Sequence, residues 1–430
     1  MTYAEAVARI LALRGGERAG MRPGRERIEA MLAAIGHPEQ AFVIAQVGGT
    51  NGKGSISAML AAALQAAGRR VGLYTSPHLT HYRERIRVDG RPISEADFVD
   101  GVDALGTLIT RLDLTVFEAG TALALDHFCR VRVDVAVLEV GLGGRLDATT
   151  VGTPRVVALG PIDYDHQHEL GDTLTLIAAE KAAIIRSGVA FSARQDPEAE
   201  AVLTRRAGEV GVPVLFEGRD LHVTPLGFTL EAQRLHLEGP GWRFADVACG
   251  LLGLYQPGNA LLAAAAAREL GADEAAIRAG LRGARWPGRF QIFRREPTVI
   301  LDGAHNPAGA RALAASLRAY FPGRPVTFVI GVMADKDAGA MLAALRPLAT
   351  RVILTAAANP RAAAPGALRA LLPAGTRVDL IPLAREALAA AVAEDPHGLV
   401  CVAGSLSLIG DILAGADDAQ DVLFSAGARC

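Results

Sequence analysis

The chain has 430 residues, of which 50% are hydrophobic and 5% aromatic, and its formal net charge at pH 7 is −2. This length predicts two or three domains, because single hydrophobic cores stop growing near about 250–300 residues. The near-neutral charge gives no electrostatic reason to expect a nucleic acid or an anionic membrane as a partner. The composition is typical of an α/β enzyme with a large core.

The sequence carries no predicted targeting or membrane segment. The N-terminal stretch MTYAEAVARILALRGG lacks a basic start followed by an apolar core, so we expect no signal peptide. No run approaches the roughly 20 apolar residues that span a bilayer. The cysteines are scattered without a CxxC pair, which predicts reduced thiols of a cytoplasmic protein and neither disulfides nor zinc ligands. They are Cys129, Cys249, Cys401 and Cys430.

In the first half, short apolar runs alternate with helical patterns, which predicts βαβ units and a mainly parallel sheet. A strand is expected at 41–47, followed by a glycine-rich loop and a helix over 55–67. Further buried strands are expected at 71–76 and 133–140.

A second βα series is predicted in the C-terminal third, with strands at 298–305, 325–332, 351–356 and 399–405. The Pro- and Gly-containing segment 283–291 separates the two series and is the expected hinge. The pattern therefore predicts two α/β domains, 1–287 and 288–430, with a cleft between them.

The loop GGTNGKGS lies between the first predicted strand and its helix, an arrangement that favours phosphate binding. Backbone N–H groups around Gly52 and Gly54 would bind the anion, Lys53 would contact the outer phosphates, and Ser55 would lie near Mg²⁺. The loop departs from G-x-x-x-x-G-K-[ST], because Gly54 separates the lysine from the serine. A generic glycine turn is the alternative, and the strand-to-helix context argues against it.

Only three of the 44 Lys and Arg residues are lysines: Lys53, Lys181 and Lys336. A position that stays lysine in so arginine-rich a chain favours chemistry that needs a compact charge or a neutral amine. Chance is the alternative for any single one. For Lys181, a surface pair with Glu180 is a second alternative, and Lys336 receives no predicted role.

The motif TNGKGS resembles the loop of the Mur ligase superfamily, in particular the folylpolyglutamate synthase and dihydrofolate synthase family. Further segments resemble that family in order and spacing over nearly the whole chain. They are GMRPGRERIEAMLAAIGHPE (20–39), TSPHL (75–79), VFEAGTALA (116–124), LEVGLGGRLDAT (138–149), DHQHELGDT (165–173), EKAAI (180–184), QPGNA (256–260), PGRFQ (287–291), DGAHNP (302–307), DKD (335–337) and GS (404–405). The resemblance implies an N-terminal P-loop-type domain and a smaller, Rossmann-like C-terminal α/β domain.

The resemblance also implies a magnesium site, with two ions, at Ser76, Glu139, His166 and a carbamylated Lys181. Oxygen ligands suit Mg²⁺, and Glu139 ends a predicted strand at the sheet edge that faces a cleft. Carbamylation requires a neutral amine, which burial beside metals can supply. Taken alone, Glu139 could instead be a paired or capping carboxylate, and His166 a structural histidine.

Substrate residues are implied in the same way. The pterin would contact Thr115, Val116, Phe117, Glu118, Leu146, Asp147 and Ala148. ATP would contact the phosphate loop and Asn259, Arg289 and Asp302, while His305 and Ser405 are candidates for the glutamate subsite. A core position for Phe117 and a helix-capping role for Asp147 are the alternatives.

The implied reaction is ATP-dependent amide formation between a folate-type carboxylate and L-glutamate through an acyl phosphate, with Lys53, Lys181 and His305 as catalytic residues. The expected partners are ATP, L-glutamate and dihydropteroate or reduced folates, and the expected state is a monomer. A Mur-type peptidoglycan ligase and a non-ligase P-loop NTPase remain alternatives. The chain departs from the family pattern at Thr150, Gly160, Pro161 and Ala183, which leaves the detailed geometry near His166 and the substrate loop open.

Overall fold

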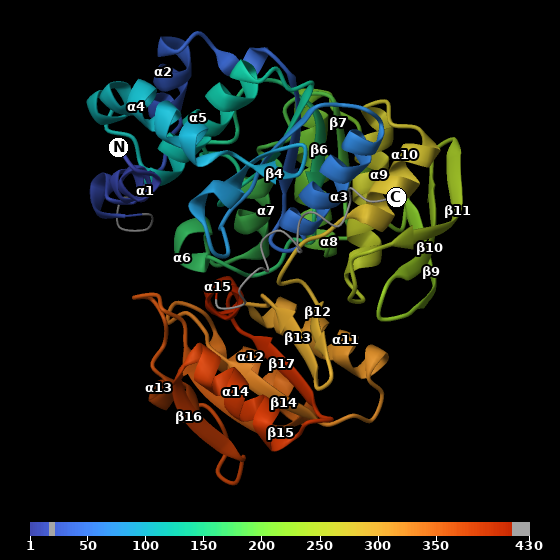
Figure 1. Cartoon of the computed structure of the whole chain (residues 1–430). Helices are drawn as coiled ribbons and strands as arrows, with labels where there is room; N and C mark the ends of the chain where they lie inside the picture. The colour runs from blue at the N-terminus through green and yellow to red at the C-terminus, as the bar shows by residue number, and fades with distance from the viewer. Residues whose placement is uncertain (17–21, 415–430) are drawn as a thin grey trace.

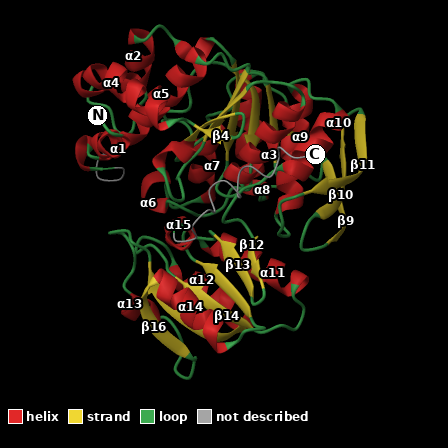
Figure 2. Cartoon of the chain, viewed as in Figure 1, coloured by secondary structure: helices red, strands yellow, loops and turns green. Residues whose placement is uncertain are grey.

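The computed structural model describes residues 1–16 and 22–414. The N-terminal part of the chain, blue to yellow in Figure 1, lies beside a smaller C-terminal part drawn in orange and red. Helices cover the sheets of both parts (Figure 2), which confirms the α/β class. Cys430 and the first two residues of the segment 20–39 lie outside the described residues.

The larger sheet has eight strands in the order β4-β3-β2-β5-β1-β6-β7-β8. Its pairs are parallel from β2 to β8, while β3 and β4 are antiparallel additions at one edge. The strands are β1 (Val43–Gly48), β2 (Val71–Tyr74), β3 (Ile86–Val88), β4 (Arg91–Pro92), β5 (Val135–Glu139), β6 (Pro154–Leu159), β7 (Val189–Ser192) and β8 (Val214–Phe216).

Helices pack on both faces of this sheet, as the nearly continuous burial of its central strands requires. Alternate residues of β1 enter different cores, Ala45 and Val47 with α3 and Ile44 with the N-terminal helices. The helices are α1 (Tyr3–Leu11), α2 (Glu26–Ala34), α3 (Lys53–Ala66), α4 (Glu95–Arg111), α5 (Val116–Arg130), α6 (Gln167–Leu170), α7 (Leu174–Ala182), α8 (Pro197–Val210), α9 (Gln256–Glu269) and α10 (Glu274–Gly283).

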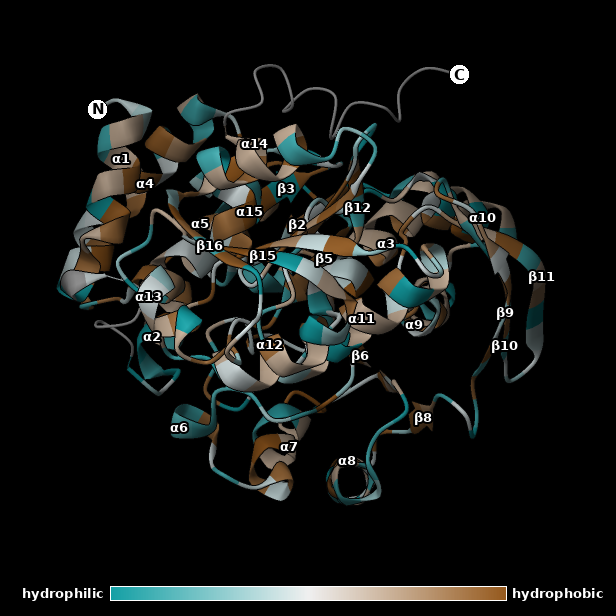
Figure 3. Ribbon diagram, turned by 90° about the horizontal axis from the view of Figure 1, so that it is seen from below, coloured by the Kyte–Doolittle hydropathy of each residue, from teal (hydrophilic) through white to brown (hydrophobic). Residues whose placement is uncertain are grey.

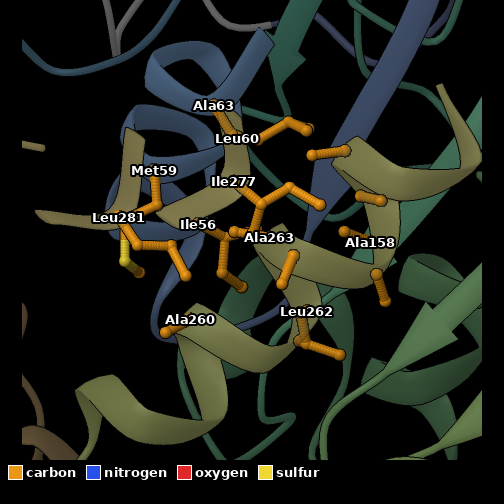
Figure 4. Packing of buried hydrophobic residues seen from close by; sticks show 14 of the residues in the cluster. Ile56, Met59, Leu60, Ala63, Ala158, Ala260, Leu262, Ala263, Ile277 and Leu281 are labelled. Carbon is orange, nitrogen blue, oxygen red and sulfur yellow. The ribbon is translucent and has the colours of Figure 1, made fainter. Parts of the chain in front are cut away.

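The core around α3 depends on small residues that let helices approach closely. Figure 4 shows Ile56, Met59 and Leu60 of α3 against residues of α9 and α10. Gly280 of α10 lies so close to α3 that an added Cβ would meet the Ala63 backbone at 2.3 Å. This tight packing fixes the direction of α3, whose first turn carries the phosphate loop.

A three-stranded antiparallel sheet, in the order β11-β10-β9, extends the N-terminal part. This sheet is not among the elements predicted from the sequence. Its strands are β9 (His222–Phe228), β10 (Gln233–Gly239) and β11 (Trp242–Cys249). Leu235 and Leu237 on β10 and Val247 on β11 join the core that also contains α3 and α9.

The C-terminal sheet has the order β12-β13-β17-β14-β15-β16 and is parallel except for the β12–β13 pair. Its strands are β12 (Gln291–Arg295), β13 (Thr298–Asp302), β14 (Val326–Ile330), β15 (Ala349–Ala356), β16 (Val378–Leu383) and β17 (Leu399–Ala403). The helices are α11 (Pro307–Tyr320), α12 (Ala338–Leu345), α13 (Pro365–Arg369), α14 (Ala384–Glu394) and α15 (Leu406–Leu413). Short 3₁₀ helices complete the chain at η1 (Leu13–Gly15), η2 (Pro38–Gln40), η3 (Tyr82–Arg85) and η4 (Arg346–Leu348).

The predicted strands and the helix after the phosphate loop are confirmed, with ends that differ by at most three residues. Strand order explains why distant motifs meet. Because β1 lies between β5 and β6, Val47 is paired with Glu139 and Gly48 with Leu159. The loops that follow these three strands therefore share one edge of the sheet, where α/β proteins bind ligands.

Apolar residues are frequent along the central strands in Figure 3, whereas polar residues dominate peripheral elements such as α6. Over residues 1–16 and 22–414, none of the helices is long and apolar enough to cross a membrane.

Candidate active site

The phosphate loop connects β1 to α3, and α3 begins at Lys53. Gly52 has a left-handed backbone (φ 85°) that an L side chain rarely adopts. An added Cβ at Gly52 would also meet Asn259 Oδ1 at 2.5 Å. A Cβ at Gly54 would meet Trp286 Nε1 at 2.6 Å. The two glycines of GKG are therefore required by contacts with two different side chains.

The start of α9 supports this loop from the side. Gln256 donates through Nε2 to Ser55 Oγ (3.1 Å) and accepts from Asn259 Nδ2 (2.9 Å). All three side chains are buried. Asn259, expected to contact ATP, therefore lies directly beside the phosphate loop.

Gly160 and Pro161, where the chain departs from the family pattern, also pack on the phosphate loop. The Pro161 carbonyl accepts from the Thr50 backbone N–H (2.9 Å), and Thr50 Oγ1 donates to the Asp163 carbonyl (3.0 Å). A Cβ at Gly160 would lie 2.3 Å from the Asn51 carbonyl oxygen. Gly160 is required by this close approach, and the loop toward His166 is thereby fixed to the phosphate loop.

Lys53 lies in a pocket of about 320 Å³ at the edge of the sheet, together with Asp165, His166, Lys181 and His305. Its Nζ donates to the carbonyls of residues 49 and 50, both at 3.1 Å. Burial lowers the pKa of Lys53, although the charges of Glu139 and Asp165 oppose that shift. The expected phosphate-binding lysine is thus a partly desolvated cation.

Glu139 and Ser76 line a neighbouring pocket and contact each other. The Ser76 backbone N–H donates to Glu139 Oε2 (3.1 Å), and Glu139 is 5% exposed. Burial raises the pKa of Glu139 to about 7, with the charge of Lys53 opposing the shift. A bound cation would stabilise the ionised form of this buried carboxylate.

Lys181 is 5% exposed, which excludes the surface-pair alternative. Glu180 instead pairs with Arg145 (2.7 Å). The hydrogen bond from Lys181 Nζ to the Gly49 carbonyl is long, at 3.4 Å. Burial and the charge of Lys53 lower the pKa of Lys181 to about 7, so a large share of the amine is neutral at physiological pH.

Lys336 connects the C-terminal part to the loop that carries His166. Its Nζ lies 2.5 Å from Asp165 Oδ1 and 3.4 Å from His166 Nε2, and the side chains of Lys336 and Asp165 are 9% and 8% exposed. Burial lowers the pKa of His166 to about 4 against the attraction of Asp165. Burial would raise the pKa of Asp165, but His166 and Lys336 hold it well below its usual range.

Asn306 makes a second connection between the two parts of the chain. Its Nδ2 donates to Asn51 Oδ1 (3.1 Å) in the phosphate loop and to Asp165 Oδ2 (3.0 Å). Its Oδ1 accepts from the Gly309 backbone and caps α11. Asp165 and Asn306 lie inside motifs of the sequence, but no role is predicted for them, since their contact spans 141 residues.

The first group of expected pterin residues lies at the start of α5. Thr115 and Glu118 form its capping box, and Val116 is buried in the core. Glu118 also pairs with Arg27 (2.9 Å). Phe117 is partly exposed and packs near Tyr74, with ring centroids 5.9 Å apart.

The second group of expected pterin residues follows β5. Asp147 is buried, and its carboxylate accepts from the Leu142 N–H (2.9 Å) and from the N–H (2.9 Å) and hydroxyl (2.5 Å) of Thr149. Asp147 therefore holds its own loop together. It caps no helix, because none begins between β5 and β6, so the helix-capping alternative is wrong. Ala148 is buried and Leu146 is partly exposed. Phe117 and Leu146 are the members of the two groups whose side chains can be reached.

The expected residues of the C-terminal part lie along its contact with the N-terminal part. Asp302 is 2% exposed and accepts from Tyr255 Oη (2.8 Å) and the Phe290 and Ala304 N–H groups, and burial raises its pKa. Arg289 donates to the Gly303 carbonyl (3.3 Å) and lines the pocket of Glu139.

His305 and Ser405, both expected at the glutamate subsite, differ in position. His305 Nδ1 lies 2.8 Å from the Gly303 carbonyl, and burial with the charge of Arg289 lowers the pKa of His305 to about 4. Ser405 is 3% exposed and caps α15, accepting from the Leu408 N–H. The structure places His305 in the pocket of Lys53, whereas the Ser405 hydroxyl is committed to its helix.

The donor types among the expected metal ligands fit Mg²⁺ in part. Glu139 and Ser76 supply oxygens in one pocket, and His166 and Lys181 lie in the adjoining one. In the part of the chain that the structure describes, no three His, Cys, Asp or Glu side chains converge on one point. The protein oxygens alone would therefore not complete the coordination of Mg²⁺, which usually keeps several waters and binds substrate phosphates.

The fold and this site define a class of protein. The chain matches the Mur ligase middle domain over residues 47–267 and the Mur ligase glutamate ligase domain over residues 288–406. It is 36% identical to the folylpolyglutamate synthase of Lacticaseibacillus casei, covering 95% of this chain and 97% of that protein. The chain therefore belongs to the folylpolyglutamate synthase and dihydrofolate synthase family of the Mur ligase superfamily.

Other relatives carry related names. The Escherichia coli dihydrofolate synthase/folylpolyglutamate synthase is 35% identical over 91% of this chain and 90% of that protein. A probable bifunctional folylpolyglutamate synthase/dihydropteroate synthase of Halobacterium salinarum is 39% identical over 96% of this chain. The chain spans about half the length of that relative and of its Haloferax volcanii counterpart.

Solved structures agree with the fold. The Mycobacterium tuberculosis folylpolyglutamate synthase complexed with ADP and AMPPCP aligns with a TM-score of 0.90 at 34% identity, over 96% of this chain and 98% of that one. The E. coli FolC protein in complex with DHPP and ADP aligns with a TM-score of 0.89 at 31% identity, over 96% and 97% of the two chains.

Proposed function

We propose that this chain is an ATP-dependent ligase that joins L-glutamate to a folate-type carboxylate. The observation that carries the proposal is the single pocket in which Lys53, at the start of α3, lies with Lys181 and with His305 of the C-terminal part. A nucleotide phosphate, an activated carboxylate and an amino-acid amine must meet in such a place. The relatives named above act on folates by name, and this supports the choice of substrate.

In the first step, an oxygen of the acceptor carboxylate attacks the γ-phosphorus of ATP, an acyl phosphate forms and ADP leaves. Lys53 contributes a fixed positive charge next to the transferred group, and the N–H groups at the start of α3 bind its oxygens. The contacts of Gln256 with Ser55 and of Pro161 with Thr50 hold this loop in one position before ATP arrives. Catalysis at this step is chiefly positioning and charge stabilisation.

In the second step, the amine of L-glutamate attacks the acyl carbon, and inorganic phosphate leaves as the amide forms. His305 keeps a neutral imidazole, whose Nδ1 donates to the Gly303 carbonyl and whose Nε2 remains an acceptor for the incoming ammonium group. The contacts of Lys336 and Asn306 with Asp165 close the pocket between the two parts of the chain. Closure keeps water away from the acyl phosphate.

Mg²⁺ fits the proposal, held by Glu139, Ser76, His166 and Lys181. When bound, it neutralises phosphate charge. Lys181 would reach it after its neutral amine has added CO₂ and lost a proton, which yields a carbamate oxygen. The pKa of about 7 leaves enough neutral amine for this addition.

The test is an assay of the purified protein with ATP, Mg²⁺, labelled L-glutamate and either dihydropteroate or tetrahydrofolate. Glutamate incorporation with one ADP formed per amide is expected with dihydropteroate and with tetrahydrofolate. ATP hydrolysis that depends on neither pterin would contradict the proposal and favour a non-ligase NTPase. The proposal includes domains at 1–287 and 288–430, a monomer and a cytoplasmic location.

A further inference from the structure

A pocket of about 450 Å³ lies between the loop after β2, the hinge before β12 and the start of α15. Glu139 lies in its wall together with Ser76 and Arg289, so one side of the pocket belongs to the proposed reaction centre. Arg87 and Trp286 are also in the wall. The reaction described so far gives these two side chains no role.

Arg87 is a buried and well-fixed cation. It lies on β3, is 5% exposed, and donates through Nε to the Glu84 carbonyl (2.9 Å). Its guanidinium carbon is 5.5 Å from the ring centroid of Trp286. Burial lowers the pKa of Arg87 to about 10, with the charge of Glu84 opposing the shift, so the side chain stays charged at neutral pH.

The acidic groups that face this pocket are Glu84 and Glu139. The Glu84 carboxylate accepts from the backbone N–H groups of Leu79, Thr80 and His81, so it is committed to the loop after β2. Glu139 belongs to the proposed metal site. The cations in the wall are Arg87 and Arg289, and guanidinium groups are suited to binding a carboxylate of a ligand.

We propose that this pocket binds the α-carboxylate of the terminal glutamyl residue of a folate acceptor, with Arg87 as its counter-charge. This inference rests on the proposed ligase function. In a glutamyl residue the α- and γ-carboxyl carbons are at most about 5 Å apart, a separation fixed by four C–C bonds. With the γ-carboxylate reacting beside Glu139, the α-carboxylate extends into the pocket that Arg87 lines.

The subsite separates the two reactions of the proposed function. Dihydropteroate has one carboxylate, which reacts, and it presents nothing to Arg87. Tetrahydrofolate and its polyglutamates carry an α-carboxylate next to the reacting group. Arg87 is therefore a specificity-determining residue for chain elongation and not for the first glutamate addition.

The experiment compares steady-state kinetics of Arg87→Met and Arg87→Lys with both acceptors. In Arg87→Met, KM for tetrahydrofolate is expected to rise by about 10- to 100-fold, as for loss of a charged hydrogen bond. The kcat/KM for dihydropteroate should stay within about threefold, and Arg87→Lys should fall between. Arg91→Met is the matched control, because exposed Arg91 of β4 pairs with Val88 in the same hairpin.

A change in the substrate tests the same contact without depending on the folding of a variant. The wild-type protein should bind the α-carboxamide analogue of tetrahydrofolate more weakly than tetrahydrofolate by a similar factor, and Arg87→Met should not distinguish the two ligands. If Arg87→Met lost kcat/KM equally with both acceptors, or with neither, the proposed subsite would be overturned. A wild-type protein that uses dihydropteroate alone would overturn it too, while the ligase proposal would survive. A wild-type protein inactive with both acceptors would instead reject the proposed function.

Discussion

Gly54 separates Lys53 from Ser55, and the structure shows which neighbour requires that glycine. The indole of Trp286 lies against it, so a Cβ there would be 2.6 Å from Nε1. The second glycine of GKGS is therefore required by a contact with a side chain more than two hundred positions away. The phosphate loop could be predicted from the sequence. The contact of Gly54 with Trp286 could not, because no residue near the loop indicates it.

We expect Gly54→Ala to reduce kcat by about 100-fold, because displacing the start of α3 misplaces Lys53. The melting temperature should change little, since only the first turn of α3 has to move. Steady-state kinetics and thermal unfolding measure the two effects. Adding Trp286→Leu should restore part of the turnover, and a double variant no better than Gly54→Ala would contradict this explanation.

For Lys181 the central question is whether its charge or its capacity to carry CO₂ matters. If it acts as a carbamate, Lys181→Arg should be as damaging as Lys181→Ala, each lowering kcat by about 100-fold or more, as loss of one electrostatic contact does. Native mass spectrometry should find one additional CO₂ on the wild-type protein and none on either variant. Near-normal activity in Lys181→Arg would reject the carbamate.

At the scale of elements, the loop after β2 shows how a buried carboxylate organises a segment. Glu84 is 8% exposed and accepts from three consecutive backbone N–H groups at residues 79–81 and from Thr80 Oγ1 (2.5 Å). Burial would raise the pKa of Glu84, but these hydrogen bonds outweigh it and lower the pKa. The loop that forms one wall of the Arg87 pocket is thus stabilised by an ionised side chain.

We expect Glu84→Gln to lower the free energy of unfolding by about 1–3 kcal/mol at neutral pH. Because the pKa of Glu84 is lower in the folded than in the unfolded chain, this stabilisation is complete above the unfolded value near 4.5 and is lost as the pH falls below it. Urea unfolding of both proteins from pH 7 to pH 3.5 measures the difference. A difference that stays constant over this range would show that ionisation of Glu84 plays no part.

The parallel strands could be predicted from the sequence, whereas the β9–β11 sheet could not. Central strands such as β5 are buried along their whole length and read as continuous apolar runs. Strand β9 is exposed at nearly every position, so it offers no contrast between two faces. Strand β10 does alternate, with buried Leu235 and Leu237, but a single short alternation is a weak signal without its partners.

At the scale of the whole molecule, the site is assembled where the N-terminal and C-terminal parts meet. Asp165 accepts from Lys336 and Asn306 of the C-terminal part and sits next to His166. Motif matching located these residues in the sequence, and the resemblance assigned a role to His166. The buried interdomain contact depends on how two sheets are placed, and no local pattern carries that information.

We expect Lys336→Met to loosen this contact, because it leaves the carboxylate of Asp165 buried without its cation, a change that typically costs about 3–5 kcal/mol. Small-angle X-ray scattering should give a larger radius of gyration, with turnover reduced at least about tenfold. Arg311→Met is the control, since its pair with Asp163 (3.4 Å) also joins the two parts but is exposed. Equal effects of both variants would show that the buried pair has no special role in closure.

The proposed reaction depends on an acyl phosphate formed from the acceptor carboxylate, and an isotope experiment tests that step directly. Dihydropteroate labelled with ¹⁸O in both carboxylate oxygens is incubated with the protein, ATP, Mg²⁺ and L-glutamate, and the inorganic phosphate is analysed by mass spectrometry. One ¹⁸O per phosphate is expected, because the carboxylate oxygen that attacks ATP leaves with the phosphate when the amide forms. Amide formation accompanied by unlabelled phosphate would contradict the mechanism.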